Sequence, residues 1–435
     1  MAILIKGGKI LDPAKGTVEE NNIIIDDGVI ERILPPGDFG NDYGELEHVD
    51  AYGKIIIPGL IDMHTHLREP GYEYKETIAT GANAGMAGGF TSLACMPNTN
   101  PVNDNSAVTK YILDQAGKLN NIKIYPIAAI TRGQKGKRLT DFSDLSRAGS
   151  VGVSDDGFHV EDEDIMLQAI KLAARNNLAI ISHCETTALS KGGVMLKGYV
   201  SDKMGLKGIP PESEETAVKR DLALAKLAHC PVHIAHVSTK GSVEAIRRAK
   251  DEGVLVTAET APHYFSLDHT AVEVYNTNAK MNPPLAMAED VEAVKKGLRE
   301  GVLDVIATDH APHSIGEKDQ DFNKAPFGII GLETALPLSL ALVEQGVLTL
   351  PGVIGKMTCS PARILGIEGG TIEIGRPADL AIIDLECEYE LQAEDLRSKS
   401  RNSPFIGRRM KGRNTVTIAG GRIVWKRDEQ HISSR

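Results

Sequence analysis

The sequence predicts an α/β fold in which a TIM-like (β/α)8 barrel lies beside a small β-sandwich domain formed from both ends of the chain. Three features indicate this fold: apolar strand-like runs alternate with helix-period segments through the middle of the chain, short strands with turn signals occupy both ends, and aromatic residues make up only 4% of the 435 residues. The core is therefore built from Ile, Val, Leu and Ala. The predicted divisions are 1–55 and 366–435 for the β domain and 56–365 for the barrel.

Eight strands are expected in the barrel, and helical segments follow most of them. The strands span residues 55–63, 91–96, 122–130, 151–154, 179–182, 232–235, 254–258 and 304–307. The clearest helices are 164–177 and 242–253, where apolar residues recur every three or four positions and a Gly or Asn lies near the end. Because parallel strands need long crossovers, these strand-then-helix units predict a barrel.

The two ends of the chain share a β-rich pattern. Strands are expected over 2–11, 22–26, 29–34 and 49–57 near the start, and over 371–374, 378–384, 415–419 and 422–425 near the end. Turn signals such as Asp27-Gly28 and Gly420-Gly421 separate them. We expect the two ends to pair into one discontinuous β-sandwich.

Charge and composition exclude several classes of function. There are 48 Lys and Arg against 59 Asp and Glu, a net charge of −11, which argues against nucleic-acid and anionic-membrane partners. No apolar run approaches the ~20 residues that cross a bilayer, and no signal-peptide pattern is expected. The five cysteines are scattered without a C-x-x-C pair, which favours free thiols in a reducing cytoplasm.

Metal-ligating side chains follow five of the predicted barrel strands, at the carboxyl ends where barrel enzymes carry their chemistry. His64 and His66 follow the first strand two residues apart, so they face the same side of an extended chain. The other strand ends carry Asp155 and Asp156, His183, His236, and Asp309. Such buried groups need compensation, and a His/Asp set without Cys suits Zn²⁺ better than Mn²⁺, Co²⁺ or Fe²⁺. Six ligands are enough for two ions that share a bridging carboxylate.

Longer motifs make this pattern specific. They are HTHLREPG at 64–71, MPNTNP at 96–101, SDDG at 154–157 and TDHAPH at 308–313. Together they resemble the class I, bacterial long-chain dihydroorotases of the amidohydrolase superfamily. The similarity extends over essentially the whole chain, including GRPADL at 375–380. A bare H-x-H would indicate the superfamily alone.

The resemblance implies a zinc-dependent enzyme that interconverts N-carbamoyl-L-aspartate and dihydroorotate, the third step of pyrimidine biosynthesis. It implies one or two zinc ions per chain, with two favoured. The implied ligands are His64, His66 and Asp309 for one ion, His183 and His236 for the other, and Asp156 as the bridge. Asp309 is also the implied general base. Many relatives bridge with a carbamylated lysine, which this strand end lacks, and without the resemblance Asp155 stays open as the bridge.

Substrate contacts are implied for a further set of residues: Arg68, Asn98, Asn282, His313 and the backbone of Phe327 and Gly328. Arg68 suits a substrate carboxylate because a guanidinium can donate two parallel hydrogen bonds. The alternatives are a surface salt bridge from Arg68 to Glu69 or Glu73, and a turn-forming role for Asn282 before proline. The polar, aperiodic segment 314–326 is expected to be a mobile lid.

Two other functions remain as alternatives. The first is another cyclic amidohydrolase (a hydantoinase, dihydropyrimidinase or allantoinase), against which Arg68 and the missing lysine argue. The second is a non-catalytic dihydroorotase-like scaffold for aspartate transcarbamoylase; such relatives have lost metal ligands, whereas this chain keeps all six. For an active enzyme the resemblance favours a homodimer and leaves a partnership with aspartate transcarbamoylase open.

Overall fold

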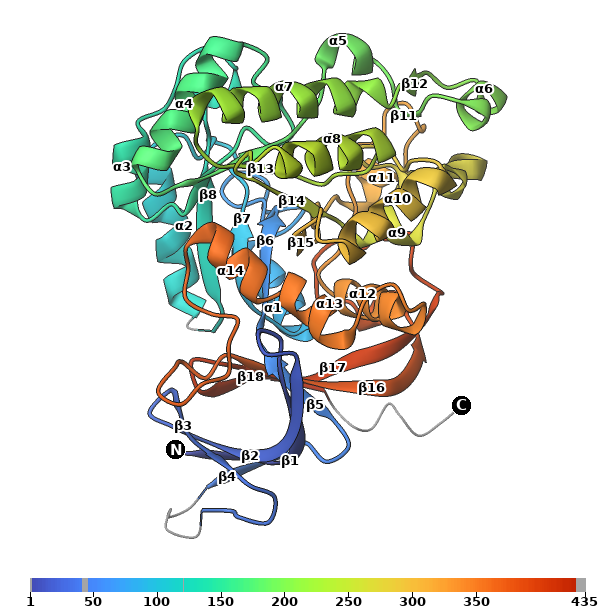
Figure 1. The fold of residues 1–435 in the computed structure, drawn as a ribbon. Helices are drawn as coiled ribbons and strands as arrows, with labels where there is room; N and C mark the ends of the chain where they lie inside the picture. Colours follow the sequence, from blue (N-terminus) through green and yellow to red (C-terminus); the bar gives the residue numbers. More distant parts are fainter. Residues whose placement is uncertain (1, 41–45, 120, 428–435) are drawn as a thin grey trace.

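A computed structural model describes residues 2–40, 46–119 and 121–427, which form two eight-stranded sheets and a two-stranded one. Figure 1 places the barrel above a terminal sheet, in which the blue N-terminal strands lie beside the red C-terminal ones. Among the described residues, no helix has the length and apolar character to span a bilayer.

The barrel consists of parallel strands that neighbour one another in chain order. They are β6 (Leu60–Thr65), β7 (Phe90–Cys95), β8 (Lys123–Ala128), β9 (Gly152–Val153), β10 (Ala179–Ser182), β13 (Val232–Ile234), β14 (Val256–Thr260) and β15 (Val305–Ile306). A parallel bridge between Thr65 and His310 brings the chain after β15 beside β6 and nearly closes the ring. The predicted (β/α)8 barrel is confirmed, and its strand ends converge on one face.

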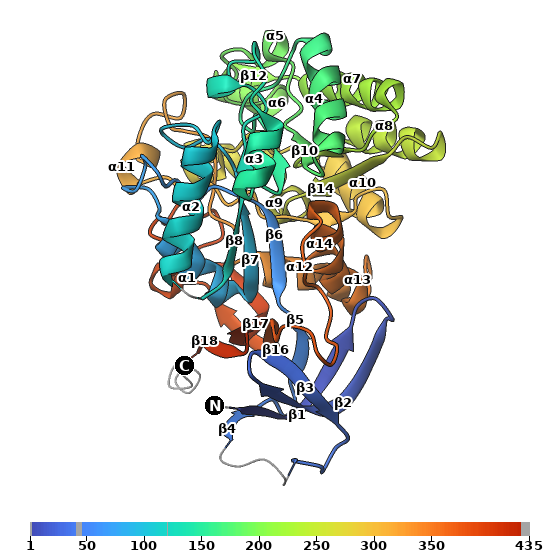
Figure 2. The same ribbon diagram turned by 90° about the vertical axis from the view of Figure 1, so that its left-hand side faces the viewer.

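Helices cover the outside of the barrel. Their bounds are α1 (Ile78–Gly88), α2 (Ser106–Leu119), α3 (Phe142–Ala148), α4 (Glu163–Arg175), α5 (Thr187–Ser190), α6 (Tyr199–Met204), α7 (Glu212–Ala228), α8 (Lys240–Asp251), α9 (Pro262–Ser266), α10 (Ala288–Arg299), α11 (Ile315–Lys318), α12 (Ala335–Glu344), α13 (Leu350–Lys356) and α14 (Cys359–Leu365). Figure 2 shows α1 and α2 beside β7 and β8, against which they pack. The two clearest predicted helices correspond to α4 and α8, which begin after the side-chain caps Asp162 and Thr239.

The terminal sheet interleaves both ends of the chain in the order β18-β17-β16-β5-β1-β2-β3, with β4 paired to β1. Its strands are β1 (Ile3–Asp12), β2 (Thr17–Asp26), β3 (Val29–Leu34), β4 (Glu47–Asp50), β5 (Ile55–Pro58), β16 (Leu380–Glu390), β17 (Arg409–Ala419) and β18 (Arg422–Lys426). The strand predicted at 371–374 is wrong, because Gly375 turns the chain there with a φ of 83°.

The strand predicted over 55–63 is two strands in different sheets. β5 pairs with β16 and β1 in the terminal sheet, whereas β6 pairs with β7 in the barrel. Gly59 separates them at a point of close approach, since a Cβ there would lie 2.2 Å from Oγ1 of Thr91. The domain divisions 1–55, 56–365 and 366–435 remain a prediction, and residues 428–435 lie outside the described chain.

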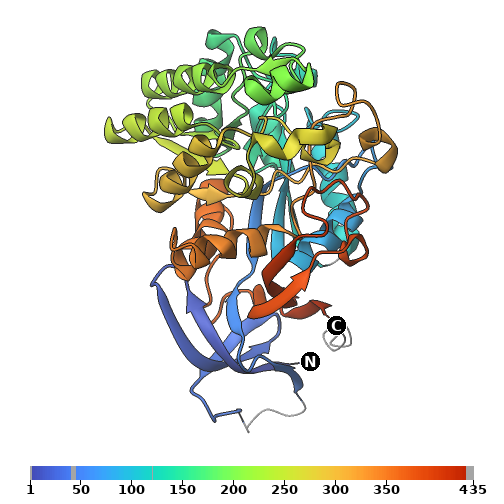
Figure 3. The same ribbon diagram turned by 90° about the vertical axis from the view of Figure 1, so that its right-hand side faces the viewer.

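Two long connections reach the barrel mouth. Within residues 314–326, Lys318 and Phe322 are buried, and Nζ of Lys318 donates hydrogen bonds to the carbonyls of Pro326 and Gly328, each 2.9 Å away. This packing counts against the mobile lid expected from the sequence. The red chain between β16 and β17 leaves the terminal sheet and runs beside the barrel (Figure 3).

Candidate metal centre and active site

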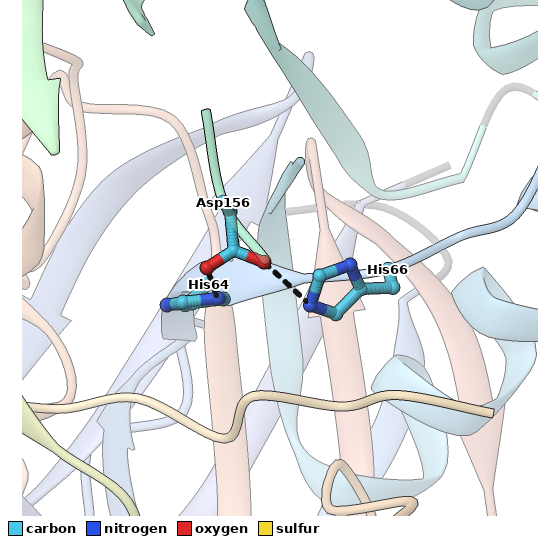
Figure 4. A group of neighbouring side chains, drawn as sticks. All are labelled: His64, His66 and Asp156. Carbon is cyan, nitrogen blue, oxygen red and sulfur yellow. Dashed lines mark ion pairs between the residues drawn. The ribbon is translucent and has the colours of Figure 1, made fainter. Parts of the chain in front are cut away.

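The carboxyl ends of four barrel strands bring together the imidazoles and the carboxylate predicted to bind metal. His64, His66 and Asp156 form one group and Asp156, His183 and His236 a second, with the ligand atoms of each group within 4.8 Å of one another. All five side chains are buried. Figure 4 shows the Asp156 carboxylate directed at the rings of His64 and His66.

The distances from the four histidines to Asp156 are close to those between ligands of one metal ion. Nε2 of His64 and Nε2 of His66 lie 3.3 and 3.4 Å from the two oxygens of Asp156. In the second group, Nδ1 of His183 and Nε2 of His236 lie 3.7 and 3.6 Å from Oδ1 of Asp156. A tetrahedral ion with bonds of about 2.1 Å holds its ligand atoms about 3.4 Å apart. Asp156 is therefore placed to contact an ion in either group.

Some polar atoms of the cluster are left without hydrogen-bond partners, as expected for metal ligands. Among the described residues, Nε2 of His64 and Oδ1 of Asp156 are buried and accept or donate no hydrogen bond. Burying such atoms unpaired is costly, and a cation in contact with both would offset the cost. The donor set of nitrogen and carboxylate oxygen without sulfur fits a divalent ion such as Zn²⁺.

Asp309 lies at the edge of the first group. Its Oδ1 is 3.1 Å from Nε2 of His66 and 3.6 Å from Nε2 of His64. Burial acts to raise the pKa of Asp309, but the hydrogen bond with His66 and the charge of His64 lower it below its usual range. Asp309 is thus an ionised carboxylate, close enough to share an ion with the two histidines and able to accept a proton.

The neighbouring aspartate, Asp155, faces away from the cluster. Its carboxylate accepts hydrogen bonds from the backbone N–H, at 3.0 Å, and the hydroxyl of Thr131. Burial raises the pKa of Asp155 to about 6. The choice between the two adjacent aspartates, which alternation alone left open, therefore favours Asp156.

Two carboxylates and an amide hydrogen-bond to the imidazoles of the cluster and fix their orientation. The two carboxylates, Glu259 and Glu185, were not predicted from the sequence. Nδ1 of His64 donates to Glu259 at 2.5 Å, and Nε2 of His183 donates to Glu185 at 3.0 Å. Asn98, predicted as a substrate contact, accepts from Nδ1 of His66 at 2.8 Å. Such partners fix the ring tautomer and raise ligand basicity. Glu259 lies at the end of β14, so the strand-end rule applied to the seventh strand would have found it.

Arg68 is a buried cation that forms an ion pair with no carboxylate of the described residues. Nε donates to the carbonyl of Pro312 at 3.1 Å, and one terminal nitrogen lies 3.4 Å from Nε2 of His313. The expected alternatives do not form: Glu69 accepts from the backbone of Ile78 and Glu73 from that of Gly71, and no carboxylate of the described residues lies within ion-pair distance of the guanidinium. Burial lowers the pKa of Arg68. A buried, unpaired guanidinium near the metal-binding cluster is a site for an anion.

His313 sits between Arg68 and the chain at Phe327. Its Nε2 donates to the carbonyl of Phe327 at 2.8 Å, and its Nδ1 accepts from Nζ of Lys75 at 3.3 Å. Burial, followed by the positive charges of Arg68 and Lys75, lowers the pKa of His313. The ring is therefore neutral, with the tautomer that these two bonds require.

The other predicted substrate residues are held by hydrogen bonds within the protein. Nδ2 of Asn282 donates to Glu185 at 3.0 Å, so its side chain is tied to the carboxylate that orients His183. The N–H of Gly328 donates to the carbonyl of Lys280 at 3.0 Å, and its own carbonyl accepts from Lys318. The mouth thus offers a positively charged group at Arg68 and neutral hydrogen-bonding groups at Asn282 and Gly328.

Comparisons with known proteins agree with this geometry. A family model described as dihydro-orotase-like matches residues 53–242. The chain is 51% identical to a dihydroorotase of Geobacter metallireducens and 52% identical to one of Geobacter sulfurreducens, in each case over 98% of this chain and 100% of the relative. The chain belongs to the dihydroorotase family. It is therefore an enzyme of the cyclic amidohydrolase type, and members of this family depend on metal.

Solved structures of other cyclic amidohydrolases share the dihydroorotase fold. The L-hydantoinase (dihydropyrimidinase) from Arthrobacter aurescens superposes with a TM-score of 0.86 at 26% identity, covering 98% of this chain and 96% of that one. The dihydropyrimidinase from Brevibacillus agri has a TM-score of 0.82 at 21% identity, over 98% and 95%. Identity to the dihydroorotases is about twice as high, so the hydantoinase alternative is not favoured.

Proposed function

We propose that this protein is a zinc-dependent dihydroorotase that interconverts N-carbamoyl-L-aspartate and (S)-dihydroorotate. In hydrolysis the ring amide C–N bond breaks, a C–O bond forms from water, and the departing ring nitrogen gains a proton. The observation that carries the proposal is Arg68: a buried guanidinium with no acidic partner lies beside the cluster, where a cyclic amide bearing a carboxylate would place its charge. A cyclic amide without a carboxylate would leave the Arg68 guanidinium unpaired.

The proposed metal ligands are His64, His66 and Asp309 for one ion, His183 and His236 for the other, and Asp156 as the bridge. When bound, zinc would supply an acidified water at neutral pH and polarise the amide carbonyl. Two ions per chain are proposed because the two ligand groups share only Asp156.

The protein's own part in catalysis is proton transfer. Asp309 is the proposed general base: it takes the proton of the attacking water and delivers it to the ring nitrogen as the C–N bond breaks. The same residue acts in reverse during ring closure, the direction used in pyrimidine synthesis. Its buried, ionised carboxylate at the mouth of the cluster suits both roles.

Substrate orientation is assigned to two groups of residues at the barrel mouth. Arg68 binds the substrate carboxylate, with Asn98 and His313 as additional contacts. Asn282 and the backbone of Phe327 and Gly328 contact the ring amides. A substrate held by both groups presents one amide bond to the cluster. Holding the reacting atoms in this orientation is how such residues raise the rate.

The test is a substrate comparison combined with metal analysis. Zinc-loaded protein should hydrolyse dihydroorotate and leave dihydrouracil and allantoin essentially unchanged, with zinc measured per chain. The variant Asp156→Ala should lose metal from both groups together with activity. Faster turnover of dihydrouracil or allantoin would refute the proposal in favour of another cyclic amidohydrolase, and metal binding without any turnover would favour the scaffold.

Assembly and location are part of the same proposal. The five cysteines are all free thiols in the structure, which supports a reducing cytoplasm. We propose a homodimer and, as a second step, an association with aspartate transcarbamoylase. Light scattering of the protein alone and mixed with that enzyme tests both.

A further inference from the structure

The chain between β16 and β17 inserts one side chain into the barrel mouth. Asn402 belongs to the C-terminal part of the sequence, yet it is only 3% exposed and lies against the loops that follow β15. Nothing in the strand-end pattern of the barrel points to this residue, because it belongs to the connection between two strands of the terminal sheet.

The amide of Asn402 uses its hydrogen-bonding capacity on two loops at once. Oδ1 accepts from the backbone N–H of His313 at 3.1 Å. Nδ2 donates to the carbonyls of Ala311 at 3.0 Å and Gly328 at 3.1 Å. A carboxamide carries one acceptor group and two N–H donors, so no other side chain of this size reproduces the set.

The atoms joined by Asn402 belong to the proposed substrate site. His313 and Gly328 lie on two segments that would contact the carboxylate and the ring amide respectively. Gly328 is fixed further by Nζ of Lys318, which donates to the same carbonyl at 2.9 Å, and its φ of 125° is one that favours glycine. A Cβ at Gly328 would also meet Cβ of Ala311 at 2.7 Å, so the two segments are in close contact.

We propose that Asn402 is a positioning residue that sets the spacing between the His313 and Gly328 segments and thereby the affinity for substrate. The inference rests on the proposed dihydroorotase function and adds a residue of the C-terminal segment to its site. Asn402 touches none of the metal ligands through its side chain, so the proposal separates substrate binding from metal binding. Loss of Asn402 should raise KM and leave zinc content and kcat near their wild-type values.

Two substitutions and one control test this separation. Asn402→Ala removes the side-chain bonds, while Asn402→Asp keeps the volume but replaces both donors by a negative charge beside two carbonyls. The control is Asn414→Ala: Asn414 is also buried, at 2%, and donates to the carbonyls of Met86 and Ala87 under the barrel. Each variant is assayed for zinc per chain, melting temperature, kcat and KM for dihydroorotate.

The expected result is a rise in KM of about 10-fold for Asn402→Ala and more for Asn402→Asp, because the hydrogen bonds that hold the two segments together are lost and the Asp variant adds a negative charge beside two carbonyls. kcat should stay within about 3-fold, and Asn414→Ala should lower the melting temperature without moving KM. Wild-type KM in folded, zinc-loaded Asn402→Asp overturns the inference, as does a loss of zinc. If Asn402→Ala fails to fold, the isosteric Asp variant decides. Absence of dihydroorotate turnover in the wild type would instead remove the proposed function.

Discussion

The carboxylate of Glu259 accepts a hydrogen bond from Nδ1 of His64 at 2.5 Å, and its second oxygen lies 3.2 Å from Nε2 of His233. Glu259 is 1% exposed. The pair therefore fixes the His64 ring with Nε2 directed at Asp156, 3.3 Å away. A carboxylate behind a metal-binding imidazole raises the basicity of the ligand and restricts its rotation.

Glu259→Gln should weaken zinc binding about 10- to 100-fold, because the neutral amide no longer stabilises the polarised imidazole. Competition with a chelator measures the zinc affinity. Glu244→Gln is the matched control, since Glu244 lies on the surface of α8 and pairs with Arg248. Equal zinc affinities in the two variants would show that the Glu259 carboxylate does not strengthen metal binding by His64.

Asp309→Asn should lower kcat for dihydroorotate by about 100-fold or more, because the amide cannot accept the proton of the attacking water. Most of the zinc should be retained, since the histidines and Asp156 remain. Steady-state kinetics give kcat, and metal analysis of the same samples gives the zinc content. Near-normal kinetics in this variant would remove Asp309 from the proposed role.

Arg68→Met should raise KM for dihydroorotate about 100-fold while the metal content stays unchanged, because the substrate carboxylate loses a buried charged partner. The substrate-free variant should be at least as stable as the wild type, since an unpaired buried guanidinium is costly. Calorimetry and steady-state kinetics supply the two measurements. The control Arg248→Met removes an exposed arginine on α8, 73% exposed, and should change neither. A destabilised variant with unaltered KM would contradict the assignment.

Lys356→Met should stabilise the protein at pH 7. Burial lowers the pKa of Lys356 to about 8, below the 10.5 of an exposed lysine. Below pH 8 both folded and unfolded states carry the proton, so the folded state bears the full cost of the buried charge. Between pH 8 and 10.5 the folded state loses the proton first, and wild-type stability rises relative to the variant.

The melting temperatures of wild type and Lys356→Met should therefore differ by a few degrees at pH 7 and converge near pH 10.5. Lys171→Met, at an exposed position of α4, is the control and should give no pH-dependent difference. A constant difference across this pH range would mean that the effect comes from packing rather than charge.

The sequence by itself predicted the barrel, most of the terminal strands and the grouping of histidines and aspartates at the strand ends, because these depend on local patterns. Alternating apolar strands and helices specify their own periods, and His64 and His66 share a face through the two-residue repeat of a strand. The single strand predicted over 55–63 failed because apolar residues continue on both sides of Gly59, whereas the pairing partners change there from the terminal sheet to the barrel. Segment 314–326 has no periodic hydrophobic pattern because Lys318 holds it through hydrogen bonds to backbone carbonyls, which a sequence pattern does not reveal.

Tertiary structure alone decided which partners support the site. Glu259 meets His64 across 195 residues, and Asn402 meets His313 across 89. Such pairs leave no characteristic spacing in the sequence, since the partners come from different strands or, for Asn402, from the connection between β16 and β17. The fold also left Arg68 without the acidic neighbours that lie beside it in sequence, because Glu69 and Glu73 cap backbone N–H groups instead. Burial then makes that unpaired charge available to an anionic substrate.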